Sequence, residues 1–431
     1  MKITVIDAVM GQGKSSFAIE MINNSPDNDY IVIVPNLSEV ERYQLALDRV
    51  SVAPEVAYDI VTGRSTKLTG FRELVENGQT IVSTHSMLKN FDDRTLRAVK
   101  GGQYTLVLDE VVELIEPFND VNQYDFETYV ASGIFKKQEV LPGIFRILPG
   151  STEYWESGWA VKFMRDVRDG HMYQARGSFF VWMAPPEQLE AFKHVFILTY
   201  MFKGSVMASW LDHFQVPYEL KTVSRLTGAL LAYWDEGGRA FRHLVKLNDD
   251  PKINQMKSKK TESMGATWFK KAPTKTLKKT NADMITFFKS TGLSNDKCLY
   301  SCHMSDKGLP ILNPRGYVTS TKKKLSYLMG IKDHTEKARD LNFIPVNMKA
   351  SNLYKEREAV AYPFTMYPHQ ALKVFFQDSG IPFDEDRYAL SEMIQLLWRS
   401  AIRDGKEVNL YIPSYRMRTL FLNWLNPSSI G

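Results

Sequence analysis

A chain of 431 residues with 44% hydrophobic side chains can bury a large core and fold as two or three domains. Its net charge of +5 permits a polyanionic partner without requiring one. Two cysteines, Cys298 and Cys302, are too few to form a zinc site and are typical of a reducing compartment. Because no apolar run reaches the ~20 residues that cross a bilayer, we expect a cytoplasmic protein with no membrane partner.

The chain opens on a phosphate-binding pattern. An apolar run at 3–9 predicts a buried strand, and an amphipathic helix carrying Phe17 and Ile22 follows it. The turn between them consists of Gly11, Gln12, Gly13, Lys14, Ser15 and Ser16. In such a layout the turn's N–H groups and the positive helix end cradle a phosphate, a lysine reaches the β- and γ-oxygens, and a serine hydroxyl coordinates Mg²⁺. We therefore predict a site for ATP and Mg²⁺ rather than a plain turn with a solvated lysine.

Further apolar runs predict strands at 30–36, 80–85, 104–110 and 194–200. Alternation with helical stretches indicates a parallel sheet covered on both faces, with ligands at the carboxyl ends of its strands. Asp109 and Glu110 lie at one such end. An aspartate there suits Mg²⁺ binding, and a glutamate suits orientation or deprotonation of the attacking water. A lone Asp-Glu pair is more often a solvated turn, but the Lys14 turn favours the catalytic interpretation.

Two regions allow more than one interpretation. Residues 120–185 are rich in aromatic side chains, which favours an accessory subdomain with an aromatic core over a surface that stacks on nucleic acid. Residues 246–280 are rich in lysine, typical of either a solvated face or a phosphate-binding one.

A second α/β pattern begins near Met284, with a predicted helix at 388–404. Gln395, Arg399 and Arg403 are spaced four residues apart, so a continuous helix would place them on one face. Guanidinium groups are suited to bidentate contacts with a triphosphate. The alternative is a surface helix whose arginines pair with local acids.

The motifs, in order, resemble the motor core of superfamily 2 helicases. The pattern A-x-x-G-x-G-K-S from Ala8 resembles motif I, and Asp109-Glu110 stands where the DExx motif belongs. Val34-Pro35-Asn36 and Ser83-Thr84-His85 resemble nucleic-acid-contacting motifs, Thr199 occupies the place of the coupling motif, and the segment containing Asn352 resembles motif V. The Gln395–Arg403 stripe resembles motif VI, although its second arginine comes one residue late. Val112 replaces the usual polar residue after the acids.

The resemblance implies an α/β fold of two RecA-like P-loop lobes. The first covers 1–205 with an accessory insertion at about 120–185, a basic connecting region covers 206–280, and the second lobe covers 281–431. It also implies an ATP-dependent translocase or helicase, similar to phage-encoded DNA helicases and replication origin-binding helicases. Glu110 would activate water and Gln395, Arg399 and Arg403 would complete the ATP site. Arg403 would be the arginine finger and Arg399 would contact the γ-phosphate, or the two roles would be exchanged.

The implied partners are single-stranded or forked DNA, with RNA equally open, and replication proteins. Asn36, Thr84, His85 and Asn352 would contact the nucleic acid. Two alternatives stay open: an ATP-switched DNA-binding or remodelling protein that separates no strands, and a terminase-type packaging ATPase.

Overall fold

The computed structural model describes residues 1–49, 51–119, 121–150, 159–235, 237–254, 264–305, 310–317, 342–346 and 354–427. The chain forms two compact units. The first contains Met1–Tyr233 and Pro368–Tyr388, and the second contains Trp234–Tyr367 and Ala389–Gly431. The chain therefore leaves the first unit, builds most of the second, and returns once before it ends. Among the described helices, none is long and apolar enough to cross a membrane.

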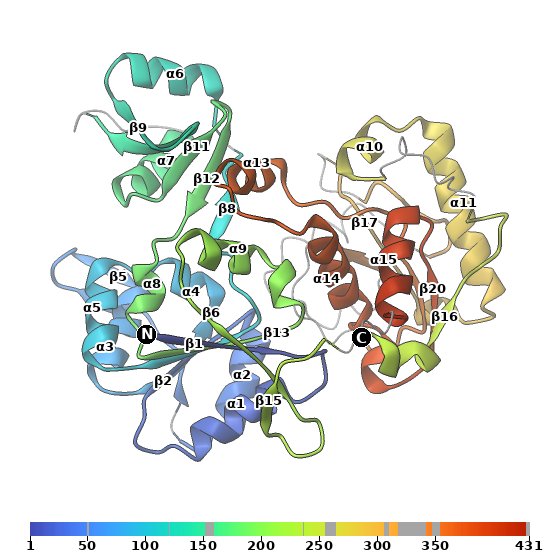
Figure 1. Cartoon of the computed structure of the whole chain (residues 1–431), viewed down its shortest axis with the longest axis horizontal. Coiled ribbons are helices and arrows are strands. Elements are labelled where there is room, and N and C mark those ends of the chain that lie inside the picture. Colours follow the sequence, from blue (N-terminus) through green and yellow to red (C-terminus); the bar gives the residue numbers. More distant parts are fainter. Residues whose placement is uncertain are drawn as a thin grey trace. The chain divides into compact units, whose positions relative to one another are not determined.

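The first unit is built on an eight-stranded sheet (Figure 1). In spatial order its strands are β15 (Leu230–Ala232), β14 (Glu219–Val223), β1 (Lys2–Asp7), β13 (His194–Thr199), β7 (Thr105–Asp109), β2 (Tyr30–Val34), β6 (Thr80–Thr84) and β3 (Ser51–Val52). All run parallel except β15, which pairs antiparallel with β14. Because β13 lies between β1 and β7, the strand before the Lys14 turn and the strand that carries Asp109 are second neighbours.

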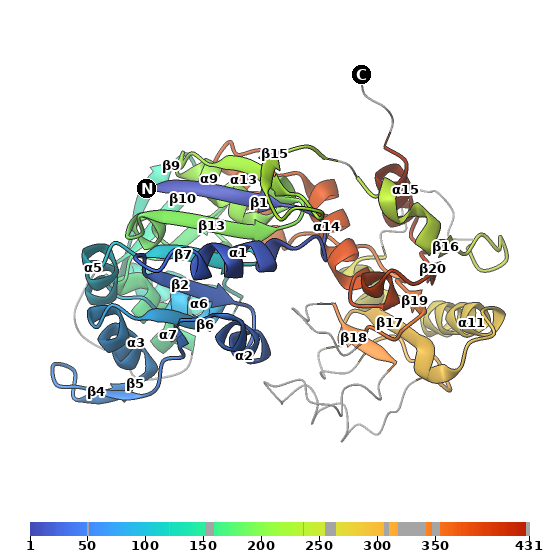
Figure 2. The same ribbon diagram turned by 90° about the horizontal axis from the view of Figure 1, so that it is seen from below.

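Helices cover both faces of this sheet, which explains why β2 is buried at every position. On one face, α1 (Lys14–Asn23) and α2 (Leu37–Ala46) share an apolar core with β1, β2 and β7. The other core contains residues of α3 (Lys67–Glu76), α4 (His85–Lys89), α5 (Asp93–Gly101), α8 (Glu187–Glu190) and α9 (Val206–His213). A small hairpin of β4 (Ala57–Asp59) and β5 (Arg64–Thr66) precedes α3. In Figure 2 it lies on the side of α3 that faces away from the large sheet.

The aromatic-rich region folds as a separate antiparallel sheet inserted after β7. Its strands are β8 (Ile115–Pro117), β12 (Phe179–Met183), β11 (Met172–Ala175), β10 (Ile144–Pro149) and β9 (Phe135–Leu141), with helices α6 (Gln123–Ala131) and α7 (Trp159–Arg168). Phe118, Phe126, Phe135, Phe163 and Phe180 form its core. The aromatic side chains thus pack inward, as expected for an accessory subdomain.

The second unit has a parallel sheet in the order β16 (Val245–Leu247), β20 (Val408–Tyr411), β19 (Ala359–Ala361), β17 (Cys298–Cys302) and β18 (Phe343–Pro345). Its helices include α10 (Ala266–Lys271), α11 (Thr274–Ser290) and α15 (Tyr415–Leu425), and α14 (Glu385–Leu397) begins in the first unit and ends in the second. The expected fold class, α/β with parallel sheets and an insertion in the first lobe, is confirmed.

The unit boundaries differ from the expected ones. The region 206–280, expected to connect two lobes, supplies β14 and β15 to the first sheet and β16 to the second. In addition, α13 (Gln370–Asp378) belongs to the first unit, where its apolar side chains join the core of the sheet and the insertion. Strand pairing and long-range apolar packing therefore set the division, and local composition does not reveal either.

Candidate nucleotide site

The Lys14 turn has the geometry of an anion-binding loop. Strand β1 ends at Asp7 and helix α1 begins at Lys14. Gly11 and Gly13 have φ angles of 82° and 91°, a left-handed conformation that glycine adopts without steric cost. The first turn of α1 carries no acidic residue and its N-cap offers no side-chain acceptor, so its N–H groups suit an anion. The Lys14 ammonium group lies over the same loop and donates to the Ala8 and Val9 carbonyls at 2.5 and 3.2 Å.

The phosphate loop contacts the acidic end of β7 through Ser15 and Asp109. The Ser15 Oγ donates a hydrogen bond of 2.9 Å to Asp109 Oδ2, although the two residues are 94 positions apart. Burial raises the pKa of the Asp109 carboxyl above its ordinary value, against the opposing effect of its donors. A buried carboxylate beside a hydroxyl is the oxygen-donor set that Mg²⁺ prefers. Ser15 and Asp109 are therefore the residues that would hold Mg²⁺, which would neutralise charge on the phosphates.

Glu110 follows β7 directly and has an unusual backbone. Its φ angle is 77°, in the left-handed region that few non-glycine residues occupy. Its N–H donates to the Leu198 carbonyl at 2.9 Å, which ties the tip of β7 to β13. Strained non-glycine residues cluster at functional sites, so this conformation supports a role for the Glu110 side chain.

Helix α2 supplies two side chains that the motifs do not reveal. Tyr43 Oη donates to Asp109 Oδ2 at 2.8 Å, and Arg42 Nη2 donates to the same oxygen at 3.1 Å. Burial, followed by the nearby Asp109 charge, raises the pKa of Tyr43 well above its usual value, so its hydroxyl stays a hydrogen-bond donor. In the sequence both residues belong to a polar helix, and only a tyrosine flanked by acids and an arginine hints at the contact.

Asp7 is a third residue that the sequence interpretation missed. Its carboxylate accepts hydrogen bonds from the N–H groups of Met201 and Phe202, at 2.8 and 2.9 Å. Burial raises the pKa of Asp7, while these two N–H groups and the nearby Lys14 charge act in the opposite direction. The Thr199 carbonyl accepts from Ala8 N–H at 3.0 Å. The start of the phosphate loop is therefore fixed to the segment that follows β13.

The residues assigned to nucleic acid have different surroundings. Val34 pairs with Thr84, the last residue of β6, so Thr84 and Asn36, two residues after β2, lie at the same edge of the sheet. Asn36 caps α2 by accepting from Glu39 N–H at 3.1 Å, which gives it a structural role as well. His85 is buried at the start of α4 and is not available on the surface. Asn352 lies outside the described residues.

The predicted arginine stripe is not continuous, so that expectation was wrong. Helix α14 ends at Leu397, and Arg403 is exposed in a 3₁₀ turn, Ala401–Asp404. The helix ends because Ser400 bonds through both its N–H and its hydroxyl to the Leu397 carbonyl. The next amide, Ala401 N–H, turns away to the Arg357 carbonyl at 2.9 Å. Gln395 remains on α14, where its amide donates to Ser391 Oγ at 3.2 Å.

A known family model matches the C-terminal part of the chain. A family model described as "YonV C-terminal Rossmann-like domain" matches residues 239–425, the part that holds the second parallel sheet. Over 98% of both chains, the protein is 26% identical to the SPbeta prophage-derived uncharacterized protein YonV of Bacillus subtilis (strain 168).

Two similar solved structures are described as Xpd4 of S. tokodaii and as "XPD_APO". The first has a TM-score of 0.45 and 13% identity, and covers 98% of this chain and 94% of its own. The second has a TM-score of 0.49 and 11% identity, and the match covers 99% of this chain and 96% of the solved chain.

Proposed function

We propose that the protein is an ATP-dependent nucleic-acid translocase or helicase that uses Mg²⁺. The observation that carries the proposal is the 2.9 Å hydrogen bond between Ser15 and Asp109. It joins the phosphate loop and the acidic strand end within one unit, as the chemistry of nucleotide hydrolysis requires. The strained Glu110, one residue further, is the group we assign to the attacking water.

In this proposal, separate residues bind the phosphates and activate the water. The loop amides and Lys14 bind the β- and γ-phosphates, and Glu110 accepts a proton from the water that attacks. The roles of Gln395, Arg399 and Arg403 in hydrolysis stay predictions, because α14 ends at Leu397 and Arg403 lies in a separate 3₁₀ turn. The prophage relative suggests a phage origin. We further propose a role in phage DNA replication or recombination, with single-stranded or forked DNA as the partner.

One observation favours a second candidate. The Val112 side chain stands where a polar coupling residue is expected, and it is only 1% exposed within the apolar core. Such a side chain makes no hydrogen bond to a nucleotide or nucleic acid. An ATP-switched DNA-binding or remodelling protein that separates no strands is therefore the alternative, and an unwinding assay on forked DNA and RNA distinguishes the two.

The central test is the ATPase rate with and without single-stranded DNA. We expect Lys14→Ala, Glu110→Gln and Arg403→Ala each to lower turnover at least tenfold, equivalent to about 1.4 kcal/mol in the barrier. Lys67→Ala is the control, because Lys67 is an exposed lysine at the start of α3. Unchanged turnover in Lys14→Ala and Glu110→Gln would overturn the ATPase proposal. Unchanged turnover in Arg403→Ala alone would remove only the finger assignment.

A further inference from the structure

The carboxyl edge of the second sheet gathers aromatic and basic side chains that the ATPase site does not use. Strands β17, β19 and β20 run parallel, so the segments that follow them emerge at one edge. Tyr367 lies in the segment after β19, and Tyr415 and Arg416 begin α15 after β20. In parallel α/β sheets, ligands bind outside this edge.

The two segments form a fixed platform. The Arg416 guanidinium carbon lies 4.8 Å from the centroid of the Tyr367 ring, and Arg416 Nη1 donates to the Met366 carbonyl at 2.8 Å. Hydroxyl groups of Thr365 and Ser414 are 2.7 Å apart and join the segments below the surface. Even so, Tyr367 is 41% exposed and Tyr415 is 61% exposed. Fixed but exposed aromatic rings are suited to stacking on a planar ligand.

Helix α10 adds a third aromatic residue at the same edge. Thr365 N–H donates to the Met264 carbonyl at 3.0 Å, and Phe269 contacts His303, the residue after β17, with ring centroids 5.8 Å apart. The neighbouring Trp268 lines a shallow pocket of about 350 Å³. The other lining residues are Thr267, Lys271, Ala272 and Pro273.

The surface beside this pocket is strongly basic. Lys270, Lys271, Lys275, Lys278 and Lys279 are all exposed. Lys275, Lys278 and Lys279 share the outer face of α11, because its opposite face buries Met284, Phe287 and Phe288. Among them, Lys279 pairs with Asp283 at 2.9 Å. Basic residues at the end of α10 suit the helix dipole, but that effect explains neither the α11 lysines nor the exposed rings.

We propose that this edge, defined by Trp268, Tyr367, Tyr415, Arg416 and the α10–α11 lysines, binds single-stranded nucleic acid. The bases stack on the three aromatic rings, and the lysines and Arg416 contact the phosphates. A positive groove with aromatic platforms is the combination by which single strands are bound without sequence preference. This inference rests on the proposed function, since it names the second unit's binding site for the same partner.

The test measures binding of a fluorescently labelled oligothymidylate to the full-length chain at several salt concentrations, without ATP. We expect Trp268→Ala to weaken binding about tenfold and Trp268→Phe to retain most of it, because either aromatic ring stacks on a base. The triple variant Lys275→Gln, Lys278→Gln and Lys279→Gln should reduce the slope of log K against log salt by about 2, since each lost phosphate contact on a single strand contributes about 0.7.

The matched control replaces Lys67, Lys100 and Lys193 by glutamine, three exposed lysines of the first unit. It should leave affinity and salt slope unchanged. Wild-type affinity in both the Trp268→Ala and the α11 variants overturns the inference, and so does equally tight binding of poly-L-glutamate to the wild type. If single-stranded DNA still stimulates the ATPase in that case, the proposed function stands. If it neither binds nor stimulates the wild type, the proposed function fails as well.

Discussion

At the scale of single residues, Asp109 has more donors than a strand-end acid requires. Its Oδ2 accepts hydrogen bonds from Ser15, Arg42 and Tyr43, within 3.1 Å in each case. Arg42 also pairs with Glu39 at 2.6 Å, so its guanidinium bridges two carboxylates. A fixed positive charge on the carboxylate that would hold Mg²⁺ would compete with the metal for that carboxylate.

Arg42→Ala should therefore tighten Mg²⁺ binding. Two unit charges about 4 Å apart interact by about 4 kcal/mol near a protein surface, and the 40% exposure of the Arg42 side chain reduces this through screening. We expect the Mg²⁺ concentration for half-maximal ATPase activity to fall about tenfold. The control is Arg49→Ala, which removes an arginine that bonds instead to the Ser25 and Asn28 carbonyls. Weaker Mg²⁺ binding in Arg42→Ala would show that Arg42 positions the carboxylate instead of competing for it.

The sequence predicted the residues of this site whose chemistry is local. The glycines, Lys14 and Ser15 share one turn, and Asp109 and Glu110 end one apolar strand, so spacing alone identifies them. Arg42 and Asp7 were missed because their roles depend on which strands are neighbours. The insertion of β13 between β1 and β7, which brings Asp7 to the Met201 amide, follows from strand order and leaves no local pattern.

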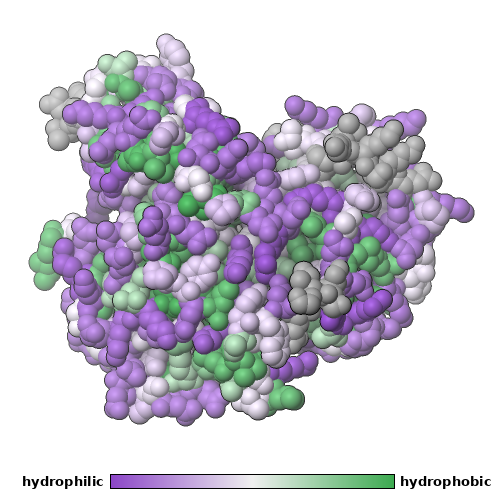
Figure 3. Space-filling view, in the orientation of Figure 1, coloured by the Kyte–Doolittle hydropathy of each residue, from purple (hydrophilic) through white to green (hydrophobic). Residues whose placement is uncertain are grey.

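At the scale of elements, the β4–β5 hairpin depends on polar contacts. Its outward side chains contribute little to a core, because Tyr58, Ile60 and Val61 are 61%, 88% and 76% exposed. An apolar patch at the left margin of Figure 3 lies where Figure 1 shows this hairpin. A Thr-Gly turn between two short β-prone runs was the available sequence signal for it.

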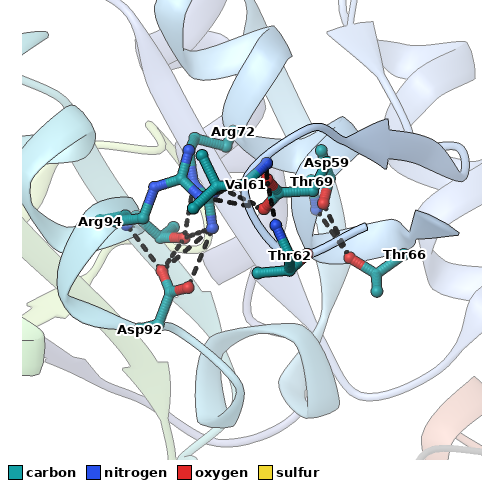
Figure 4. A network of polar contacts seen from close by, with 9 residues as sticks. Asp59, Val61, Thr62, Thr66, Thr69, Arg72, Asp92 and Arg94 are labelled. Carbon is teal, nitrogen blue, oxygen red and sulfur yellow. Dashed lines mark hydrogen bonds and ion pairs between the residues drawn. The ribbon is translucent and has the colours of Figure 1, made fainter. Parts of the chain in front are cut away.

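Asp59 makes most of the polar contacts that attach the hairpin to the rest of the unit (Figure 4). Its carboxylate accepts from Val61 N–H at 2.9 Å, from Arg72 at 3.3 Å and from Arg94 at 3.0 Å. Arg72 is 5% exposed and also donates to Asp92 at 2.9 Å. Burial alone would raise the pKa of Asp59, but the Val61 amide, Arg94 and other donors outweigh it and lower the pKa to about 2.

This pKa gives a stability prediction with a definite sign. A carboxyl group whose folded-state pKa is lowered stabilises the fold above its unfolded value of 3.8, and that stabilisation is lost as the pH falls to about 2. We expect Asp59→Asn to lower the free energy of unfolding at pH 7, and the difference from wild type to shrink below about pH 4. Urea denaturation between pH 7 and pH 3 measures it, with the exposed Asp48→Asn as control. A difference that stays constant over this range would assign the effect to packing.

At the scale of the whole molecule, the chain's return to the first unit decides how the protein divides. Helix α13 has the apolar periodicity of any amphipathic helix, so its sequence predicts burial but not the unit in which it is buried. In the structure it packs on β8, β11 and β12 of the insertion. Arg176 of the insertion also forms a 2.6 Å ion pair with Asp378, the last residue of α13. A cut at residue 233 would therefore remove part of the first unit's core.

The apolar contacts of α13 should contribute more to stability than its ion pair with Arg176. Phe375 is fully buried and packs edge-on against Tyr173, with ring centroids 6.2 Å apart. Phe375→Ala should lower the free energy of unfolding of the first unit by about 3–5 kcal/mol, through lost burial and the cavity that remains. Asp378→Asn should cost much less, because its partner Arg176 is exposed and solvent screens the ion pair. Hydrogen exchange in urea measures the stability of each unit separately. Phe375→Ala should reduce the protection of amides in β11 and β12 and leave the protection of β17 unchanged. Equal loss of protection in all three strands would mean that the two units unfold together.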